Sequence, residues 1–240
     1  MAMRTPAALA GALVLGNTLR ISESLIRRCS ADGRRIFFDP AAFDWVRVLE
    51  ADWRAIRGEL DRVLEDRARI PNFQDISEEQ RSVTQDDRWK VFVFSVFGTR
   101  IAENCARCPR TARLLDNIPG LCNAMFSILA PGKRIPEHRG PYAGLLRYHL
   151  ALKVPATAHQ CRIRVNRIDR HWEEGSTMIF DDAYPHSVAN ETDDERVVLF
   201  ADFERPLGRI LGAVNRVALA ALARSPLARR PIELLANGEP

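Results

Sequence analysis

Three side chains in the second half of the chain have the types and spacing of a metal site with an anion anchor. His138 and His186 each follow a stretch predicted to be a strand, and Arg196 opens the apolar run Val197–Phe200. Neutral imidazoles are ligands of Fe(II) in oxygenases, which leave other positions on the metal open for oxidant and cosubstrate. This pattern predicts a cupin-type β-barrel with the metal inside its mouth.

The usual carboxylate ligand of such a site is absent from its expected place. It would stand two residues after His138, where this chain has Gly140. Asp181 or Asp182, which closely precede His186, is expected to hold a metal-bound water instead. An aspartate introduced at position 140 is expected to restore a third ligand, and a missing carboxylate also leaves room for a halide.

A five-carbon diacid cosubstrate suits the remaining residues. Its keto-acid end would chelate the metal, and its far carboxylate requires a cation, for which the arginine fork of Arg196 is the best geometric match. Arg147 and His149 alternate with Leu146 and Tyr148 along the predicted strand Leu145–Val154. The two-residue period of a strand places Arg147 and His149 on one face, which we take to be the pocket face.

The elements that must position these residues are mainly strands. Besides 145–154, the sequence predicts strands at 89–96, 124–129, 161–165, 177–180, 187–189 and 197–203. Strands at such spacing without intervening helices favour a sandwich or barrel. The last two strands are expected to pair with each other across the turn at 190–195. Before the barrel, the apolar positions Phe43, Val46, Leu49, Trp53 and Ile56 predict one helix from Pro40 to about Glu65, capped by Asp39.

Both ends of the chain have features of membrane-surface helices. Ala7–Leu15 is apolar but shorter than the roughly 20 residues that span a bilayer, which favours a retained, membrane-touching helix. After Pro206 the pattern of apolar residues predicts a second helix. Arg209, Arg216 and Arg224 share one face of it. No acidic residue occurs between Glu204 and Glu233. Such a helix can lie on anionic lipid or can dock on the barrel with a solvated arginine face.

Composition limits the class of protein without choosing a partner. The chain has 240 residues, 46% of them hydrophobic, and a net charge of +4. These values fit one globular domain with a substantial core. The basic balance suits nucleic acid, anionic lipid or an anionic small substrate. Of these partners, we expect no nucleic acid. Five cysteines are an odd, sparse set, which favours a reducing compartment. The pair Cys105 and Cys108 stands alone, so we interpret these residues as structural thiols rather than a zinc or redox motif.

The block from Ser127 to Arg196 resembles the aspartyl/asparaginyl β-hydroxylase family of iron- and 2-oxoglutarate-dependent dioxygenases. The matching segments are His138–Pro141, Leu146–Leu150, Trp172–Gly175, Phe180–Asp182 with His186, and Arg196. The flanks resemble the bacterial lipid A 2-hydroxylase branch of that family, through Asp39-Pro40 with Phe43 and Trp53, Glu204–Leu207 and Ala213–Arg216. Gly140 matches the peptide-hydroxylase members and departs from the lipid A enzymes, which carry aspartate there.

The resemblance implies a mainly β fold, a double-stranded β-helix of the jelly-roll or cupin type with N- and C-terminal helices. It implies His138 and His186 as ligands of Fe(II), with O2 as oxidant. It also implies that the contacts to 2-oxoglutarate come from Ser127, Arg147, His149 and Arg196.

We therefore predict a 2-oxoglutarate-dependent hydroxylase, with Asp182 completing the catalytic set. Its domains are a helical segment at 1–36, a dioxygenase domain at 37–207 and a basic helix and tail at 208–240. The substrate is a fatty-acyl chain of an envelope lipid or an Asp or Asn residue of a peptide. The expected location is cytoplasmic, with peripheral contact at the inner face of the bacterial membrane. A halogenase and a non-catalytic barrel that binds 2-oxoglutarate or lipid are the alternatives.

Overall fold

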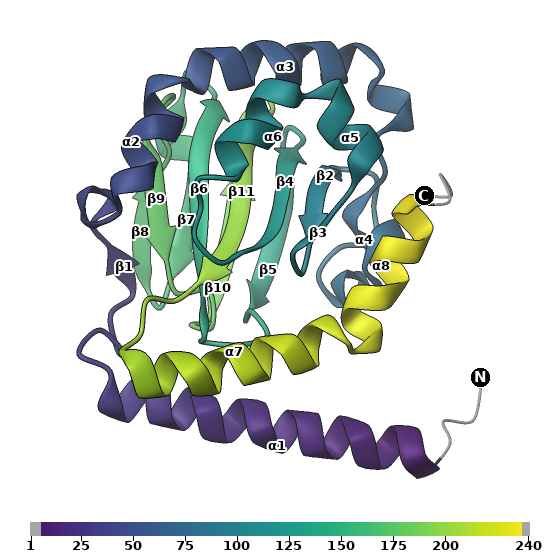
Figure 1. Ribbon diagram of the computed structural model, residues 1–240. Helices are drawn as coiled ribbons and strands as arrows, with labels where there is room; N and C mark the ends of the chain where they lie inside the picture. The colour runs from purple at the N-terminus through teal and green to yellow at the C-terminus, as the bar shows by residue number, and fades with distance from the viewer. Residues whose placement is uncertain (1–5, 237–240) are drawn as a thin grey trace.

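Two antiparallel sheets face each other in the computed structural model, which describes residues 6–236 (Figure 1). The larger sheet contains, in spatial order, β1 (Phe37–Phe38), β9 (Thr177–Phe180), β6 (Leu145–Lys153), β11 (Arg196–Glu204), β4 (Leu121–Leu129), β2 (Trp89–Val96) and β3 (Thr99–Arg100). The smaller sheet contains β5 (Arg134–His138), β10 (His186–Asn190), β7 (Cys161–Val165) and β8 (Ile168–His171). This arrangement confirms the predicted jelly roll with flanking helices.

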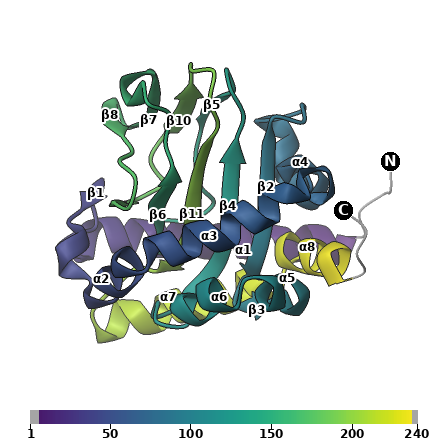
Figure 2. The same ribbon diagram turned by 90° about the horizontal axis from the view of Figure 1, so that it is seen from above.

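Helices cover the outer face of the larger sheet and one end of the barrel (Figures 1 and 2). Their bounds are α1 (Pro6–Cys29), α2 (Asp44–Ala51), α3 (Trp53–Glu65), α4 (Phe73–Ile76), α5 (Ala102–Arg107), α6 (Pro109–Leu115), α7 (Arg209–Ala223) and α8 (Pro226–Ala236). The layer formed by α2, α3, α5 and α6 lies on the side of the larger sheet that faces away from the smaller one. The helices α1 and α7 lie together at the end of the barrel.

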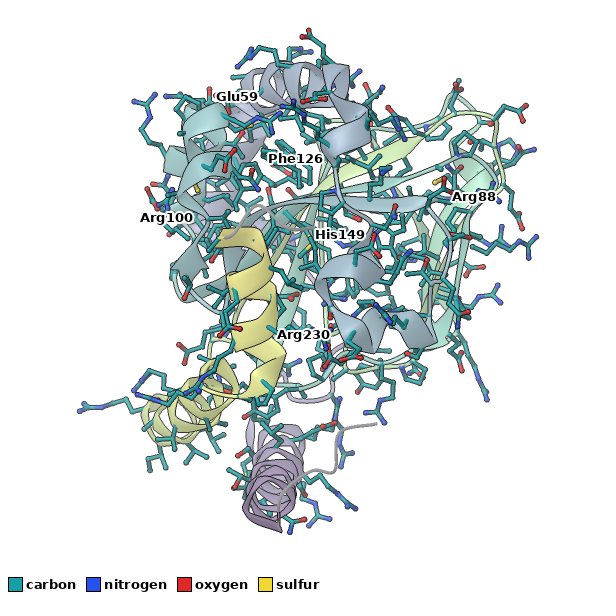
Figure 3. The ribbon with its side chains drawn as sticks, turned by 90° about the vertical axis from the view of Figure 1, so that its right-hand side faces the viewer. Glu59, Arg88, Arg100, Phe126, His149 and Arg230 are labelled. Carbon is teal, nitrogen blue, oxygen red and sulfur yellow. The ribbon has the colours of Figure 1, made fainter. Side chains whose placement is uncertain are left out.

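The central strand β11 explains why the larger sheet needs a cover on both faces. Its residues are buried on both sides: Val197 and Leu199 pack under the helical layer, whereas Val198 and Phe200 pack between the sheets. The same alternation holds on β6, where Tyr148 faces the helices and Arg147 and His149 face the space between the sheets, as the period-two pattern predicts. Figure 3 labels Phe126 and His149, which lie on opposite faces of this sheet.

The predicted pairing of the last two strands is wrong. β10 pairs with β5 and β7 in the smaller sheet, while β11 pairs with β4 and β6 in the larger sheet. The burial patterns explain this separation. β11 is buried on both faces, and β10 alternates between buried and half-buried residues as a strand does when one face of its sheet is open to solvent. The loop between the strands therefore crosses from one sheet to the other.

The predicted strand ranges do not include β1, β3, β5 or β8, and two predicted helices are broken. β5 contains Pro136 and β8 is fully exposed, and both are edge strands, where proline and polar residues are tolerated. The helix predicted from Pro40 to Glu65 is divided at Asp52 into α2 and α3, which lets both segments bury apolar side chains in one core. Asp39 does cap its start, because its Oδ1 accepts from the Ala41 N–H at 3.0 Å. The C-terminal helix also breaks, after α7.

The helices at the two ends of the described chain pack against each other. Within residues 6–236 no single helix is both long and apolar enough to cross a bilayer. The segments Arg209–Ala223 and Ala228–Ala236 together meet that length and composition, but they are bent by 51°. Helix α1 packs along α7 through a cluster that includes Ile26, Leu219 and Leu222.

The cysteine pair lies in the layer between the helices and the larger sheet. Cys105, in α5, donates to the Phe94 carbonyl at 3.5 Å, and Cys108 is fully buried just before α6. Burial raises the pKa of the Cys108 thiol to about 12, so this thiol stays protonated. All five cysteines are free thiols.

Candidate active site

His138 and His186 face each other across two neighbouring strands of the smaller sheet. His138 ends β5 and His186 begins β10, and the strand register places them directly opposite each other. Their ring centroids are 4.2 Å apart. His138 Nδ1 lies 2.9 Å from the Pro136 carbonyl and His186 Nδ1 lies 3.0 Å from the Tyr184 carbonyl. Because each Nδ1–H donates to a carbonyl, each Nε2 carries the lone pair that a metal needs.

The surroundings of both rings keep them uncharged. Burial lowers the pKa of His138, and burial together with the nearby Arg147 guanidinium lowers the pKa of His186 to about 3. A neutral imidazole is the form that binds a metal. Within residues 6–236, no third His, Cys, Asp or Glu joins the pair to form a three-residue metal cluster. The pair therefore fits a metal that keeps most of its coordination positions for water, oxidant and cosubstrate.

The structure distinguishes the two aspartates that the sequence left open. Asp182 points into the site, where its Oδ2 lies 2.7 Å from Arg147 Nη2. Asp181 points the other way: it pairs with Arg205 at 2.5 Å and with Arg27 of α1 at 3.4 Å. Burial raises the pKa of Asp182 in spite of its ion pair with Arg147. Asp182 is therefore the carboxylate that belongs to the site, and Asp181 connects the loop before β10 to α1.

The space beside Gly140 is already filled by Asp182. The Gly140 N–H donates to the Asp182 carbonyl at 2.8 Å, and a Cβ added at Gly140 would overlap the Asp182 carboxylate. The expectation that an aspartate at position 140 restores a third ligand stays a prediction, and the structure shows that the space it needs is occupied. A side chain fits there only if Asp182 moves and its ion pair with Arg147 is lost.

Gly140→Asp is expected to destabilise the fold by about 1–3 kcal/mol, the usual cost of overpacking, and not to raise the affinity for metal. Thermal unfolding and Mn(II) titration would measure the two effects. Gly58→Ala is the matched control, because no atom lies within 4 Å of the Cβ it would add. A Gly140→Asp protein that binds Mn(II) more tightly at an unchanged melting temperature would contradict this account.

Arg147 is held by two carboxylates. Besides Asp182, it pairs through Nε with Asp202 Oδ1 at 2.9 Å, and its guanidinium lies 4.3 Å from the centre of the Phe200 ring. Asn123 Nδ2 donates to the second Asp202 oxygen at 3.0 Å. These contacts fix the guanidinium close to the histidine pair. Its assignment as a contact of 2-oxoglutarate remains a prediction.

Arg196 is buried without a carboxylate partner among the described residues. Arg196 as a residue is 2% exposed; its guanidinium lies 4.7 Å from the centre of the Trp172 ring and donates through Nη1 to the Ser127 carbonyl at 3.5 Å. Its Nε has no hydrogen-bond partner in residues 6–236. Burial lowers the pKa of Arg196 to about 10, and the group still carries a proton at neutral pH. A buried guanidinium without a carboxylate partner among the described residues is suited to bind an anion.

His149 adds a second unpaired donor. Trp172 Nε1 donates to His149 Nδ1 at 3.3 Å, so the proton of this neutral ring resides on Nε2. That Nε2 is also buried without a partner in the described residues. Burial and the Arg196 charge keep the pKa of His149 well below its usual value. Ser127 Oγ accepts from Trp89 Nε1 at 3.0 Å, which leaves the Ser127 hydroxyl proton available to a ligand.

Two residues of the site escaped the sequence analysis as contributors. Trp172 positions both Arg196 and His149, although it appeared only as part of a matching segment. Asp202 fixes Arg147. Asp202 could have been found from the sequence, because it is the one charged residue in the otherwise apolar run from Val197 to Phe203. It lies an even number of residues from Val198 and Phe200, so its side chain points to the same inner face of the sheet.

Comparisons with known proteins give consistent matches. Residues 50–206 match the model of a family described as "Aspartyl/Asparaginyl beta-hydroxylase". An ornithine lipid ester-linked acyl 2-hydroxylase of Rhizobium tropici is 46% identical over 186 residues, which are 78% of this chain and 66% of that protein. Aspartate beta-hydroxylase domain-containing protein 2 of Mus musculus is 37% identical over 51% of this chain and 38% of its own length.

The human aspartyl/asparaginyl beta-hydroxylase is 30% identical over 67% of this chain and 21% of that protein. The chain thus spans just under two-thirds of the Rhizobium relative and much smaller shares of the animal proteins.

Proposed function

Because the chain belongs to the aspartyl/asparaginyl β-hydroxylase family, we propose that it is an Fe(II)- and 2-oxoglutarate-dependent hydroxylase of unactivated C–H bonds. One observation carries the proposal. The interior of the barrel contains two neutral imidazoles whose Nε2 atoms are free to bind a metal, together with a buried guanidinium that has no carboxylate partner among the described residues. His138 and His186 would hold the iron, and Arg196, with His149 and Ser127, would hold a carboxylate of 2-oxoglutarate.

Iron, oxygen and 2-oxoglutarate would supply the oxidant: one oxygen atom enters the substrate C–H bond, the other enters succinate, and carbon dioxide is released. The protein orients and shields this chemistry. Arg196 fixes the cosubstrate at one end, while Phe180 and Phe200 pack against His149 and exclude water between the two sites. Asp182, held by Arg147, would accept a hydrogen bond from a water bound to the metal.

We propose the acyl chain of an envelope lipid as the substrate, at the carbon next to its carbonyl. This choice is supported by the acyl 2-hydroxylase of Rhizobium tropici, which matches 78% of this chain at 46% identity. An Asp or Asn side chain in a peptide is the second candidate, because the human relative carries that name. The proposed location is the cytoplasmic side of a bacterial membrane, in peripheral contact with anionic lipid.

The site favours hydroxylation over halogenation. A halide ligand would need the space on the metal beside Gly140, and the Asp182 carboxylate lies against that glycine. Like charges in a buried site repel strongly, so a halide there is disfavoured. A non-catalytic barrel that only binds 2-oxoglutarate or lipid would use the same donors without turnover.

The purified protein, supplied with Fe(II), 2-oxoglutarate and oxygen, is expected to form succinate and an ornithine-lipid product heavier by one oxygen atom. Mass spectrometry of lipid and of Asp- and Asn-containing peptides, in low and in high chloride, separates the candidates. A hydroxylated peptide with unchanged lipid would move the substrate to the peptide class. A chlorinated product would establish the halogenase, and 2-oxoglutarate binding without succinate from any substrate would establish the non-catalytic barrel.

A further inference from the structure

Exposed large apolar side chains are concentrated on two helices. Among the residues whose exposure the structure describes, seven large hydrophobic side chains are exposed. Five of them lie on α1 and α7: Ile21, Leu25, Ile210, Val214 and Val217. Ile210 is 83% exposed and Val217 is 68% exposed, values that are unfavourable in water unless another surface covers them. The other two, Val48 and Ile168, lie on other elements.

These side chains share one surface because α1 and α7 run antiparallel and side by side (Figure 1). Ile26 of α1 and Leu222 of α7 belong to the buried cluster between the helices and the barrel. The opposite faces remain uncovered, and on α7 the spacing of 210, 214 and 217 forms one apolar stripe. We call the exposed faces of α1 and α7 the α1–α7 surface.

The charges of the α1–α7 surface are almost all positive. Exposed arginines flank the apolar side chains: Arg20, Arg28, Arg209, Arg216 and Arg224. The only acidic residue in either helix is Glu23, and it pairs with Arg27 and Arg139. Arg216 lies 3.8 Å from Glu204, which belongs to β11 and is mostly covered. Apolar side chains bordered by arginine are the composition of a helix that lies in the headgroup region of an anionic bilayer.

We propose that the α1–α7 surface docks on an anionic lipid bilayer, with both helices lying in the membrane plane. A second copy of the chain is a poorer occupant, because face-to-face contact would bring arginines against arginines without acids to offset them. The inference rests on the proposed function, since a lipid substrate gives the enzyme a reason to be at the membrane. It adds the surface that makes the contact and the direction in which the site faces.

Docking in this way would bring the histidine pair toward the lipid. His138 ends β5 and His186 begins β10 at the end of the barrel where α1 and α7 lie (Figure 1). Helix α1 also contacts both loops of the site, through Glu23 with Arg139 at 3.3 Å and through Arg27 with Asp181 at 3.4 Å. The α1–α7 surface and the histidine pair are therefore at the same end of the barrel.

Vesicle flotation of the full chain tests the docking. The protein is expected to float with vesicles of phosphatidylcholine mixed with phosphatidylglycerol and to float much less with phosphatidylcholine alone or in high salt. Ile210→Glu with Val217→Glu is expected to reduce the bound fraction about tenfold or more. Arg209, Arg216 and Arg224 changed together to Gln should weaken binding and remove most of its salt dependence.

Matched variants away from the surface are the controls. Val48→Glu changes an exposed valine of α2, and Arg47, Arg113 and Arg167 changed together to Gln remove as much charge elsewhere; both should bind vesicles as the parent does. Vesicle binding unaffected by Ile210→Glu with Val217→Glu would overturn the proposal. So would light scattering that shows a dimer abolished by those substitutions in a protein that does not float.

A hydroxylation assay and a vesicle-flotation assay on the same purified protein distinguish failure of this inference from failure of the proposed function. If the protein hydroxylates detergent-dispersed lipid but does not bind anionic vesicles, the docking is refuted and the proposed function stands. If the protein binds vesicles through the α1–α7 surface but hydroxylates no lipid, the docking is supported and the lipid substrate is refuted.

Discussion

His138→Ala and His186→Ala are each expected to abolish metal-dependent turnover of 2-oxoglutarate and to weaken metal binding on the order of 100-fold or more. In the proposed site the two rings are the protein ligands, and no group of three or more His, Cys, Asp or Glu that could hold a metal occurs among the described residues. Loss of one ring would therefore leave a single imidazole. Both rings are neutral and oriented by backbone carbonyls, which means that their Nε2 atoms need no rearrangement to bind. Little of the affinity can therefore be recovered by a neighbouring group.

Mn(II) titration and succinate formation measure this effect separately. The fold should persist, because removing a neutral ring leaves one carbonyl unpaired, at a cost of about 1–3 kcal/mol. His159→Ala is the matched control, since His159 is an exposed histidine in a short turn. Full activity of either site variant, or equal metal loss in the control, would show that the metal is held elsewhere.

Arg196→Met is expected to weaken 2-oxoglutarate binding by about 10- to 100-fold, since a charge-assisted hydrogen bond to a carboxylate contributes about 1.5–3 kcal/mol. Arg196→Lys should lose less, because it keeps the charge but replaces the two-pronged contact with a single point charge. Burial has already lowered the pKa of Arg196, a sign that the ligand-free protein bears a desolvation cost at this position.

Because of this desolvation cost, the melting temperature provides a second test of the Arg196 prediction. The ligand-free Arg196→Met protein should melt no lower than the parent, because an apolar side chain of similar length replaces an uncompensated buried charge. In the parent, 2-oxoglutarate should raise the melting temperature through linkage, and in Arg196→Met this rise should largely disappear. An equal rise in both proteins would show that Arg196 is not the anchor.

The sequence alone was enough to identify the family and the fold class. His138, His186 and Arg196 carry their meaning in residue type and spacing, and the matching segments around them identified the family that the comparisons confirm. The alternation on β6 was also sufficient to place Arg147 and His149 on the inner face, because a strand exposes successive side chains to opposite sides. These are local properties, which a one-dimensional pattern encodes.

Strand partners and contacts between distant segments were decided only in three dimensions. The loop 191–195 could have closed a hairpin, yet it crosses between sheets because β11 must be covered on both faces and β10 need not be. Asp181 and Asp182 are adjacent and chemically identical, and only the arginines that surround them assign Asp182 to the site and Asp181 to α1.

The same is true of the space at Gly140 and of the α1–α7 surface. The sequence shows that a ligand is missing at position 140, but only the packed structure shows that Asp182, from another loop, fills the space. Each terminal helix was recognisable as basic and apolar, but their joint surface requires α1 and α7 to meet across about 180 residues of chain, which separate Cys29 from Arg209. Such contacts depend on shape and burial throughout the whole molecule, which local residue patterns do not encode.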